Sequence, residues 1–446
     1  MFTFATPNGN SLNVARKVAL IVSSALHPIP FLRSIALHKK IAVSALAATV
    51  IVGVVAPATV AAAGPFDFTP IAGSAYGQAS TDWTEPYVLP KGYSQSLVSD
   101  ETTLDVYPGI DDLHDMNTQN ETGPQAGRYM YNTYEVGSNG AVGVTDLKTG
   151  KSTVIAQRED WNRLDGIVWT PWGSLLVTEE TTGGKVYELF LNKQNPTKVD
   201  HIEERSELGV LRHEGIGVAP DGSVFVIDEL NGGSIFKFLP TRRGDLSEGQ
   251  LYALKLTGLT DAAQKWNQAT FSEKVGGFEW VALDQALVST DADAAANAVG
   301  ATEFGRPEDV QIIGQTVYVA NTSEDRVIAI DLTKRTVSSF VQAGLNVPVE
   351  NKATQVTGLN NPDNLAVGPD GALWIVEDND FSDIYVAGKD LNKDGAADSV
   401  KLFGSLKDEG AETTGIYFGK NPKEMFVSVQ HPDKELADGI WKITRD

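Results

Sequence analysis

The chain has 446 residues, 42% of them hydrophobic and 21% charged, so it is long enough to bury a large core. Its formal net charge of −22 argues against nucleic acid as a partner, because phosphate backbones are bound by clusters of lysine and arginine. It has no cysteine, which excludes a thiol nucleophile, a thiolate metal ligand and a disulfide framework. Any metal must therefore be held mainly by carboxylates, and these select hard cations such as Ca²⁺ or Fe³⁺.

The N-terminal segment has the pattern of an export signal. A basic stretch precedes an apolar run from Ile41 to Val55, and Ala61-Ala62-Ala63 supplies an Ala-x-Ala cleavage site. The run of about 15 apolar residues is short for a membrane-spanning helix, which needs about 20. We expect residues 1–63 to be a targeting segment and residues 64–446 to form one domain. The mature protein is then a secreted or periplasmic monomer without a stable membrane span.

A strand–turn–strand unit recurs along the rest of the chain. Each copy has a short apolar strand, a tight turn and a stronger alternating strand. In two copies the turn is Pro-Asp-Gly, where Pro sets φ and Gly accepts positive φ. The copies begin near residues 166, 215, 309, 364 and 415, and residues 129–157 resemble a further copy.

The spacing of roughly 50 residues is typical of propeller blades. A β-sandwich is the alternative, but it would not repeat a whole block of this kind. The repeat is interrupted at 241–302, and helical patterns are limited to 259–270 and 291–299. The sequence predicts an all-β propeller of about six blades, with inserted loops and short helices.

Carboxylates recur just before the first strand of the repeat. The inner strands of a propeller surround its axis, so residues at the same place in successive blades meet in space. Like charges at that distance need cations between them. We therefore predict an axial metal site, whose candidate ligands from this set are Asp165, Glu214, Glu308, Asp363 and Glu412.

A second set of acidic residues ends the next strand in three copies, as Glu179-Glu180, Asp228-Glu229 and Glu377-Asp378. From this set, Glu179, Glu180 and Asp378 are further candidate metal ligands. The alternative is that both sets are solvated turn residues that cap local N–H groups.

A separate motif matches the first part of an EF-hand calcium loop. It has oxygen-bearing side chains at loop positions 1, 3, 5 and 9, which are Asp390, Asn392, Asp394 and Asp398. Position 6 is glycine, but position 12 is Lys401 instead of glutamate. We predict a structural calcium loop, with an Asn/Asp-rich hairpin turn as the alternative.

In these repeats the sequence resembles the PhoX family of alkaline phosphatases. The resemblance runs in order from about residue 165 to 432. The blocks that carry it are Thr170-Pro171-Trp172-Gly173 followed by Glu179-Glu180, His213-Glu214-Gly215, Arg306-Pro307-Glu308, Pro362 to Leu365, Gly371 to Trp374, Glu412 to Gly415, and Phe426 to Pro432.

The resemblance implies an exported phosphatase that uses Ca²⁺ and Fe³⁺ to release phosphate from small phosphate esters, for phosphate scavenging. It implies that Glu214 and Glu308 are iron ligands. Arg306 and Glu308 would be catalytic, with Arg306 and His431 binding the substrate. The family has a cysteine ligand where this chain has Asp165, so the chain would be a divergent member with a different metal set or without the activity.

Two other functions remain open. One is a calcium-dependent lactonase or esterase propeller, which would place a metal at the same axis. The other is a secreted binding propeller without catalysis, in which calcium only stabilises the blades.

Overall fold

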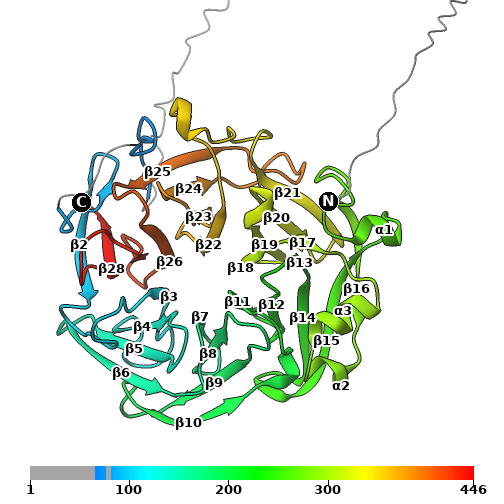
Figure 1. Ribbon diagram of the computed structural model, residues 1–446, viewed down its shortest axis with the longest axis horizontal. Coiled ribbons are helices and arrows are strands. Elements are labelled where there is room, and N and C mark those ends of the chain that lie inside the picture. Colours follow the sequence, from blue (N-terminus) through cyan, green and yellow to red (C-terminus); the bar gives the residue numbers. More distant parts are fainter. Residues whose placement is uncertain (1–65, 77–81) are drawn as a thin grey trace, which may run out of the picture. The chain divides into compact units, whose positions relative to one another are not determined.

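The computed structural model describes residues 66–76 and 82–446, which form a β-propeller with six blades around a central axis (Figure 1). The prediction of an all-β propeller is therefore confirmed. The predicted targeting segment, residues 1–63, lies outside the described residues. Within the described ranges, no helix combines the length and apolar character needed to cross a lipid bilayer.

Three blades are separate four-stranded antiparallel sheets. The first contains β3 (His114–Gln119), β4 (Tyr129–Tyr134), β5 (Ala141–Asp146) and β6 (Lys151–Gln157). The second contains β7 (Leu164–Trp169), β8 (Ser174–Glu179), β9 (Val186–Leu191) and β10 (Val199–Glu204). The sixth contains β26 (Glu412–Phe418), β27 (Glu424–Gln430), β28 (Gly439–Arg445) and, as its outer strand, β2 (Tyr93–Asp100).

The fifth blade has an extra edge strand. It contains β22 (Pro362–Val367), β23 (Leu373–Glu377), β24 (Asp383–Ala387) and β25 (Val400–Leu406), with β1 (Tyr87–Val88) paired to β25.

The third and fourth blades are joined in one nine-stranded sheet. The third contains β11 (Ile216–Val218), β12 (Val224–Ile227), β14 (Ile235–Arg242) and β15 (Asp245–Leu256). The fourth contains β18 (Pro307–Ile313), β19 (Thr316–Asn321), β20 (Arg326–Asp331) and β21 (Thr336–Gln342). β16 (Gly276–Ala282) pairs with β15 and, by its first two residues, with β21.

The interruption of the repeat is an insertion between these two blades. Besides β16, it holds three short helices and a strand that pairs back to the loop after β12. These elements are α1 (Asp261–Gln264), α2 (Gln285–Val288), α3 (Ala292–Ala298) and β17 (Phe304–Gly305), which pairs with β13 (Asn231–Gly233) in that loop. Single 3-10 turns occupy Ser206–Leu208, Thr322–Glu324 and Lys352–Thr354.

Apolar side chains fill the spaces between blades. The cluster between the first two blades, for example, contains Tyr131 and Trp169, whose stacked rings lie 6.1 Å apart. Strands such as β8 and β12 are buried along their whole length because neighbouring blades cover both faces of each sheet. The predicted strand cores are therefore continuous apolar runs more often than strict alternations.

The innermost strands of the blades surround the axis (Figure 1). β3, β7, β11, β18, β22 and β26 each contact the next, and β26 contacts β3 again. Hydrogen bonds from threonine hydroxyls connect neighbouring blades. Thr178 Oγ1 donates to the carbonyl of Glu214 and Thr322 Oγ1 to that of Pro362, both at 2.6 Å. The ring is closed by antiparallel pairing of β2 with β28.

Candidate metal and substrate site

Each of the six blades places one carboxylate on the axis near the start of its inner strand. Five of these carboxylates were predicted, and the structure brings all five together. The sixth, in β3, was missed. The six, called the axial ring below, are Asp115, Asp165, Glu214, Glu308, Asp363 and Glu412.

A repeated backbone conformation aims these carboxylates. The residue two positions before the axial carboxylate has a positive φ in five blades, as in Arg163 (44°), Arg306 (46°) and Asn361 (50°). This conformation is uncommon for residues other than glycine. It turns the carbonyl of that residue toward the end of the second strand of the same blade. The carbonyl of Arg163, for instance, accepts a hydrogen bond from Glu180 N at 2.8 Å.

The same hydrogen bond positions a second set of side chains beside the axial ring. In the first five blades the N–H that donates to this carbonyl belongs to the residue just after the second strand, or two after it in the third blade. The corresponding residue of the sixth blade follows β27. This outer ring consists of Glu135, Glu180, Glu229, Thr322, Asp378 and His431.

The axial ring and four members of the outer ring, Glu135, Glu180, Asp378 and His431, line a cavity of about 320 Å³ at the axis. Nine carboxylates and only three guanidinium groups face it, so its protein charge is strongly negative. Besides axial and outer-ring side chains, the lining includes Thr414, Gln430 and the arginines Arg163, Arg212 and Arg306.

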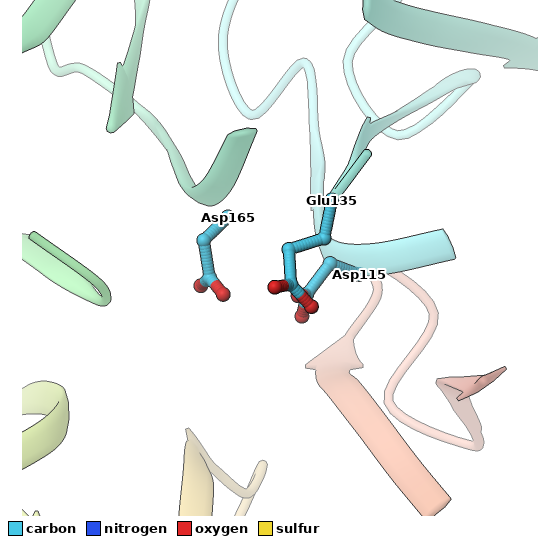
Figure 2. A group of neighbouring side chains, drawn as sticks. All are labelled: Asp115, Glu135 and Asp165. Atoms are coloured by element: carbon cyan, nitrogen blue, oxygen red, sulfur yellow. The ribbon is translucent and has the colours of Figure 1, made fainter. Parts of the chain in front are cut away.

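Some carboxylates of the two rings lie close enough to share a cation. Figure 2 shows one such group, in which Asp165 from β7 lies beside Asp115 from β3 and Glu135 from the outer ring. In each group, one oxygen per residue lies within 4.8 Å of the others. The other groups are Glu180 with Glu214 and Glu229, and Glu214 with Glu308 and Asp363.

Some of these oxygens are buried without a hydrogen-bond donor. Oδ1 of Asp165 and Oε2 of Glu308 are of this kind. Buried carboxylate oxygens without donors are costly unless a cation compensates them. The donor set consists of oxygen atoms, with no thiolate in the chain. It fits hard cations as a class.

Burial and mutual repulsion oppose ionisation of the axial ring. Burial raises the pKa of Asp115 to about 7 and that of Glu308 to about 8. Burial, reinforced by neighbouring carboxylates, raises the pKa values of Asp165, Glu214 and Asp363 well above their ordinary range. The ring therefore binds protons when no other cation is present.

Three arginines partly offset this charge on one side of the cavity. Arg163 Nη1 lies 2.6 Å from Glu135 Oε1, and Arg306 Nη2 lies 3.1 Å from Glu308 Oε1. Arg212 pairs with Glu180. Burial alone would raise the pKa of Glu180, but hydrogen bonds from Glu135 and Arg212 hold it below its ordinary value. Arg163 and Arg212 were not predicted as site residues.

Glu179 is a predicted metal ligand that the structure places outside the cavity. Its carboxylate accepts hydrogen bonds from Asn162 N at 2.9 Å and Lys185 N at 3.2 Å, so it holds the β8–β9 turn. The next residue, Glu180, faces the axis instead, because successive side chains of a strand point to opposite sides. Asp378, predicted with them, lines the cavity.

His431 lies at the cavity as predicted for a substrate-binding residue, with its Nε2 3.4 Å from Glu412 Oε1. Its side chain is 50% exposed, so it can contact a ligand entering from solvent. His213, in contrast, is buried, and its Nε2 contacts the carbonyl of Gly209 at 2.9 Å.

The predicted calcium loop lies far from the axis in the turn between β24 and β25. Its acidic oxygens mostly accept local backbone N–H groups. Asp390 Oδ1 accepts from Lys393 N at 2.6 Å and Asp398 Oδ2 from Leu391 N at 3.0 Å. None of the carboxylate groups close enough to share a cation, within the described residues, includes this loop. The structural calcium loop stays a prediction.

Glycine after an axial carboxylate has a packing reason. A Cβ on Gly215 would lie 2.1 Å from Asp309 Oδ1 of the next blade, closer than any real contact. Gly215 N also donates to the carbonyl of Glu308 at 2.9 Å. The His-Glu-Gly block thus couples Glu214 to Glu308 across two blades.

Comparison with known proteins agrees with this architecture. A sequence model of the family described as alkaline phosphatase PhoX matches residues 114–433. No curated protein matches the chain.

Among solved structures, PhoX from Pseudomonas fluorescens in complex with vanadate, described as a transition state analogue, has a TM-score of 0.59 and 18% identity. The match covers 84% of this chain and 98% of that one. A putative gluconolactonase has a TM-score of 0.45 at 12% identity, covering 80% and 94%. A virginiamycin B lyase from Staphylococcus aureus has a TM-score of 0.43 at 13% identity, covering 79% and 99%.

Proposed function

Because the chain belongs to the PhoX family of alkaline phosphatases, we propose that it is a metal-dependent phosphomonoesterase that releases phosphate from small organic phosphate esters. The observation that carries the proposal is the axial ring of six carboxylates, five of them buried, in which Oδ1 of Asp165 and Oε2 of Glu308 have no hydrogen-bond donor and Arg306 lies beside Glu308. Such a ring has little use without cations, and bound cations turn a negative cavity into an anion-binding one.

The residues that would hold the cations are those of the three carboxylate groups, with Asp165 as an oxygen ligand where the family has cysteine. Bound Ca²⁺ or Fe³⁺ would neutralise phosphoryl oxygens and stabilise charge in the transition state. Asp cannot replace a thiolate as a soft ligand, but it suits these hard ions. We therefore propose a metal set held entirely by oxygen atoms at this position.

Arg306 is the residue we assign to the phosphoryl group. Burial opposes its charge, but Glu308 and Glu229 raise its pKa, so it stays a cation at any working pH. These two carboxylates also fix the guanidinium plane at the cavity wall. A guanidinium held in this way can donate two parallel hydrogen bonds to phosphoryl oxygens. His431 lines the cavity from the sixth blade and would contact the ester.

The test is hydrolysis of a chromogenic phosphomonoester by the purified protein loaded with calcium and iron, compared with the same sample in chelator. Turnover that chelator abolishes supports the proposal. Folded, metal-loaded protein that hydrolyses lactones but not phosphoesters would overturn it in favour of the lactonase alternative. A chelator-dependent fall in melting temperature without turnover of any ester would indicate a binding propeller.

We also propose that residues 1–63 direct export, on the sequence pattern alone. Expression of the full chain in a bacterium, with fractionation and N-terminal sequencing of the product, tests this. Cytoplasmic protein that keeps residues 1–63 would contradict it.

A further inference from the structure

The arginines of the cavity stand in register. Arg163, Arg212 and Arg306 each lie two residues before the axial carboxylate, in the second, third and fourth blades. The equivalent residues of the other three blades carry no positive charge: Leu113, Asn361 and Gly410. The proposed function uses only Arg306, so two cations of this row have no assigned role.

The row is continuous because shared carboxylates link its members. Arg163 and Arg212 both contact Glu180, and Arg212 and Arg306 both contact Glu229. Neighbouring guanidinium groups are therefore only one carboxylate apart along one wall of the cavity. The row begins at Arg306, which is assigned to the phosphoryl group, and continues through Arg212 to Arg163.

The arginine side chains are more exposed to solvent than their carboxylate partners. The side chains of Arg163, Arg212 and Arg306 are 50%, 34% and 34% exposed, whereas those of Glu180 and Glu229 are 8% and 1% exposed. Arg163 contacts its partners within the described residues through Nη1 alone. A guanidinium has five N–H groups, so donors remain to face a ligand in the cavity.

Charge neutralisation alone does not explain the two extra arginines. The first and fifth blades hold axial carboxylates, Asp115 and Asp363, that are buried like those of the second to fourth blades but have no arginine at this position. The fold therefore does not need the arginine. In a cavity that takes up metal, guanidinium groups also compete with the metal for the same carboxylates. The arginines must therefore contribute something else that offsets this competition, and binding of an anionic ligand is such a contribution.

We infer that Arg163 and Arg212 form a subsite for a second phosphate group, and that the substrates of this protein carry two phosphates close together, as in diphosphate esters. This inference rests on the proposed function and specifies its substrate class. The planar N–H forks of two adjacent arginines match the geometry and the double negative charge of a phosphate better than those of a carboxylate. With Arg306 on the transferring phosphoryl group, the neighbouring phosphate meets Arg212 first and Arg163 next.

The experiment measures binding of inorganic pyrophosphate and of inorganic phosphate to the metal-loaded protein by calorimetry, at a fixed free calcium concentration. The variants are Arg163→Gln, Arg212→Gln and the charge-retaining Arg212→Lys. Arg242→Gln is the matched control, because Arg242 is 75% exposed and pairs with Asp245 outside the cavity.

We expect pyrophosphate to bind at least about 10-fold more tightly than phosphate, as one or two charge-assisted hydrogen bonds would give. Either Gln variant should reduce this preference about 10-fold, Arg212→Lys should reduce it less, and Arg242→Gln should leave it unchanged. Melting curves of each variant show that it is folded. A wild-type preference below about twofold, or a preference unaffected by both Gln variants, overturns the inference.

Failure of the phosphatase proposal gives a different result from failure of the second phosphate subsite. If the protein hydrolyses neither a phosphomonoester nor a diphosphate ester yet keeps the pyrophosphate preference, the phosphatase proposal is wrong and the subsite remains. If it hydrolyses a phosphomonoester but shows no preference, the subsite is wrong and the phosphatase proposal remains.

Discussion

The two halves of the axial ring have the same backbone but different charge. In the second to fourth blades, each axial carboxylate has an arginine two residues before it, and alternating ion pairs run from Glu135 to Glu308. In the fifth, sixth and first blades the only basic neighbour that lines the cavity is His431, 3.4 Å from Glu412. In the arginine-lined half, the arginines neutralise part of the carboxylate charge. In the other half, the carboxylate charge is neutralised only by bound cations or protons.

The difference shows that the fold and the chemistry are specified separately. A positive φ two residues before the axial carboxylate occurs in five blades, and an N–H donates to the carbonyl of that position in the first five blades, whatever side chain the position carries. The propeller therefore fixes where the side chains lie. Only the side chains decide how much of the negative charge of each half is compensated within the protein.

Glu308→Gln should have the largest effect on function. Glu308 belongs to a carboxylate group, contacts Arg306 through Oε1 and has no hydrogen-bond donor at Oε2. We expect phosphomonoester turnover to fall by about 100-fold or more, with a matching loss of bound metal measured by mass spectrometry. Glu424→Gln, which pairs with Lys442 away from the cavity, is the control. Full activity with unchanged metal content would count against the assignment.

Glu229→Gln tests the arginine-lined half in the metal-free protein. Glu229 is 1% exposed and contacts both Arg212 and Arg306, so its loss leaves two guanidinium groups uncompensated. We expect the free energy of unfolding in chelator, from urea denaturation, to fall by about 3 kcal/mol. Glu204→Gln, in an exposed pair with Lys185, should change it by less than about 1 kcal/mol. Equal effects would show that the row is not a coupled unit.

The pH dependence of the metal-free protein tests the whole ring. Burial raises the pKa of Asp115 to about 7 and of Glu308 to about 8, against about 4 in the unfolded chain. The folded state thus binds more protons, and its stability is lost as pH rises from about 4 through 8. We expect the melting temperature in chelator to fall over this range, and calcium to remove much of the fall. A melting temperature that rises with pH in chelator would contradict this.

Glu412→Gln should have the smallest effect and the opposite sign. Burial and the nearby carboxylates of Asp378 and Asp363 raise the pKa of Glu412 well above its ordinary range, and no arginine compensates it. Removing its charge should stabilise the metal-free protein by about 1 kcal/mol at pH 8, measured by urea denaturation. The gain should disappear in calcium. Destabilisation of the metal-free protein would remove the distinction between the two halves.

The fold was largely predictable because the second and third strands of each blade repeat an apolar pattern with fixed turns. The inner strand of the first blade was not predictable in this way. Its sequence, His-Asp-Met-Asn-Thr-Gln, is polar although every residue is buried. The seam with the sixth blade accepts these side chains, as when Asn117 Nδ2 donates to Ser428 Oγ at 2.8 Å.

Asp115 was missed with that strand, yet the sequence contained a signal for it. It lies 50 residues before Asp165, close to the 49 residues that separate Asp165 from Glu214 and Asp363 from Glu412. A second signal in the sequence was the Arg-x-Asp/Glu pattern at Arg163, Arg212 and Arg306, which recurs in register with the axial carboxylates. Which of two adjacent acids faces the axis, Glu179 or Glu180, depends on where the strand ends, and the sequence does not mark that residue.

The closure of the ring by β2 and β28 has a consequence for biosynthesis. His114, next to Asp115, contacts Asp438 across 324 residues of sequence, at 2.7 Å between Nδ1 and Oδ1. During synthesis, the surroundings of Asp115 are therefore incomplete until β28 has been made. A nascent chain can fold its blades one after another, but the closed carboxylate ring exists only once β28 has left the ribosome. Metal binding by the complete ring, as proposed above, would therefore follow the synthesis of β28.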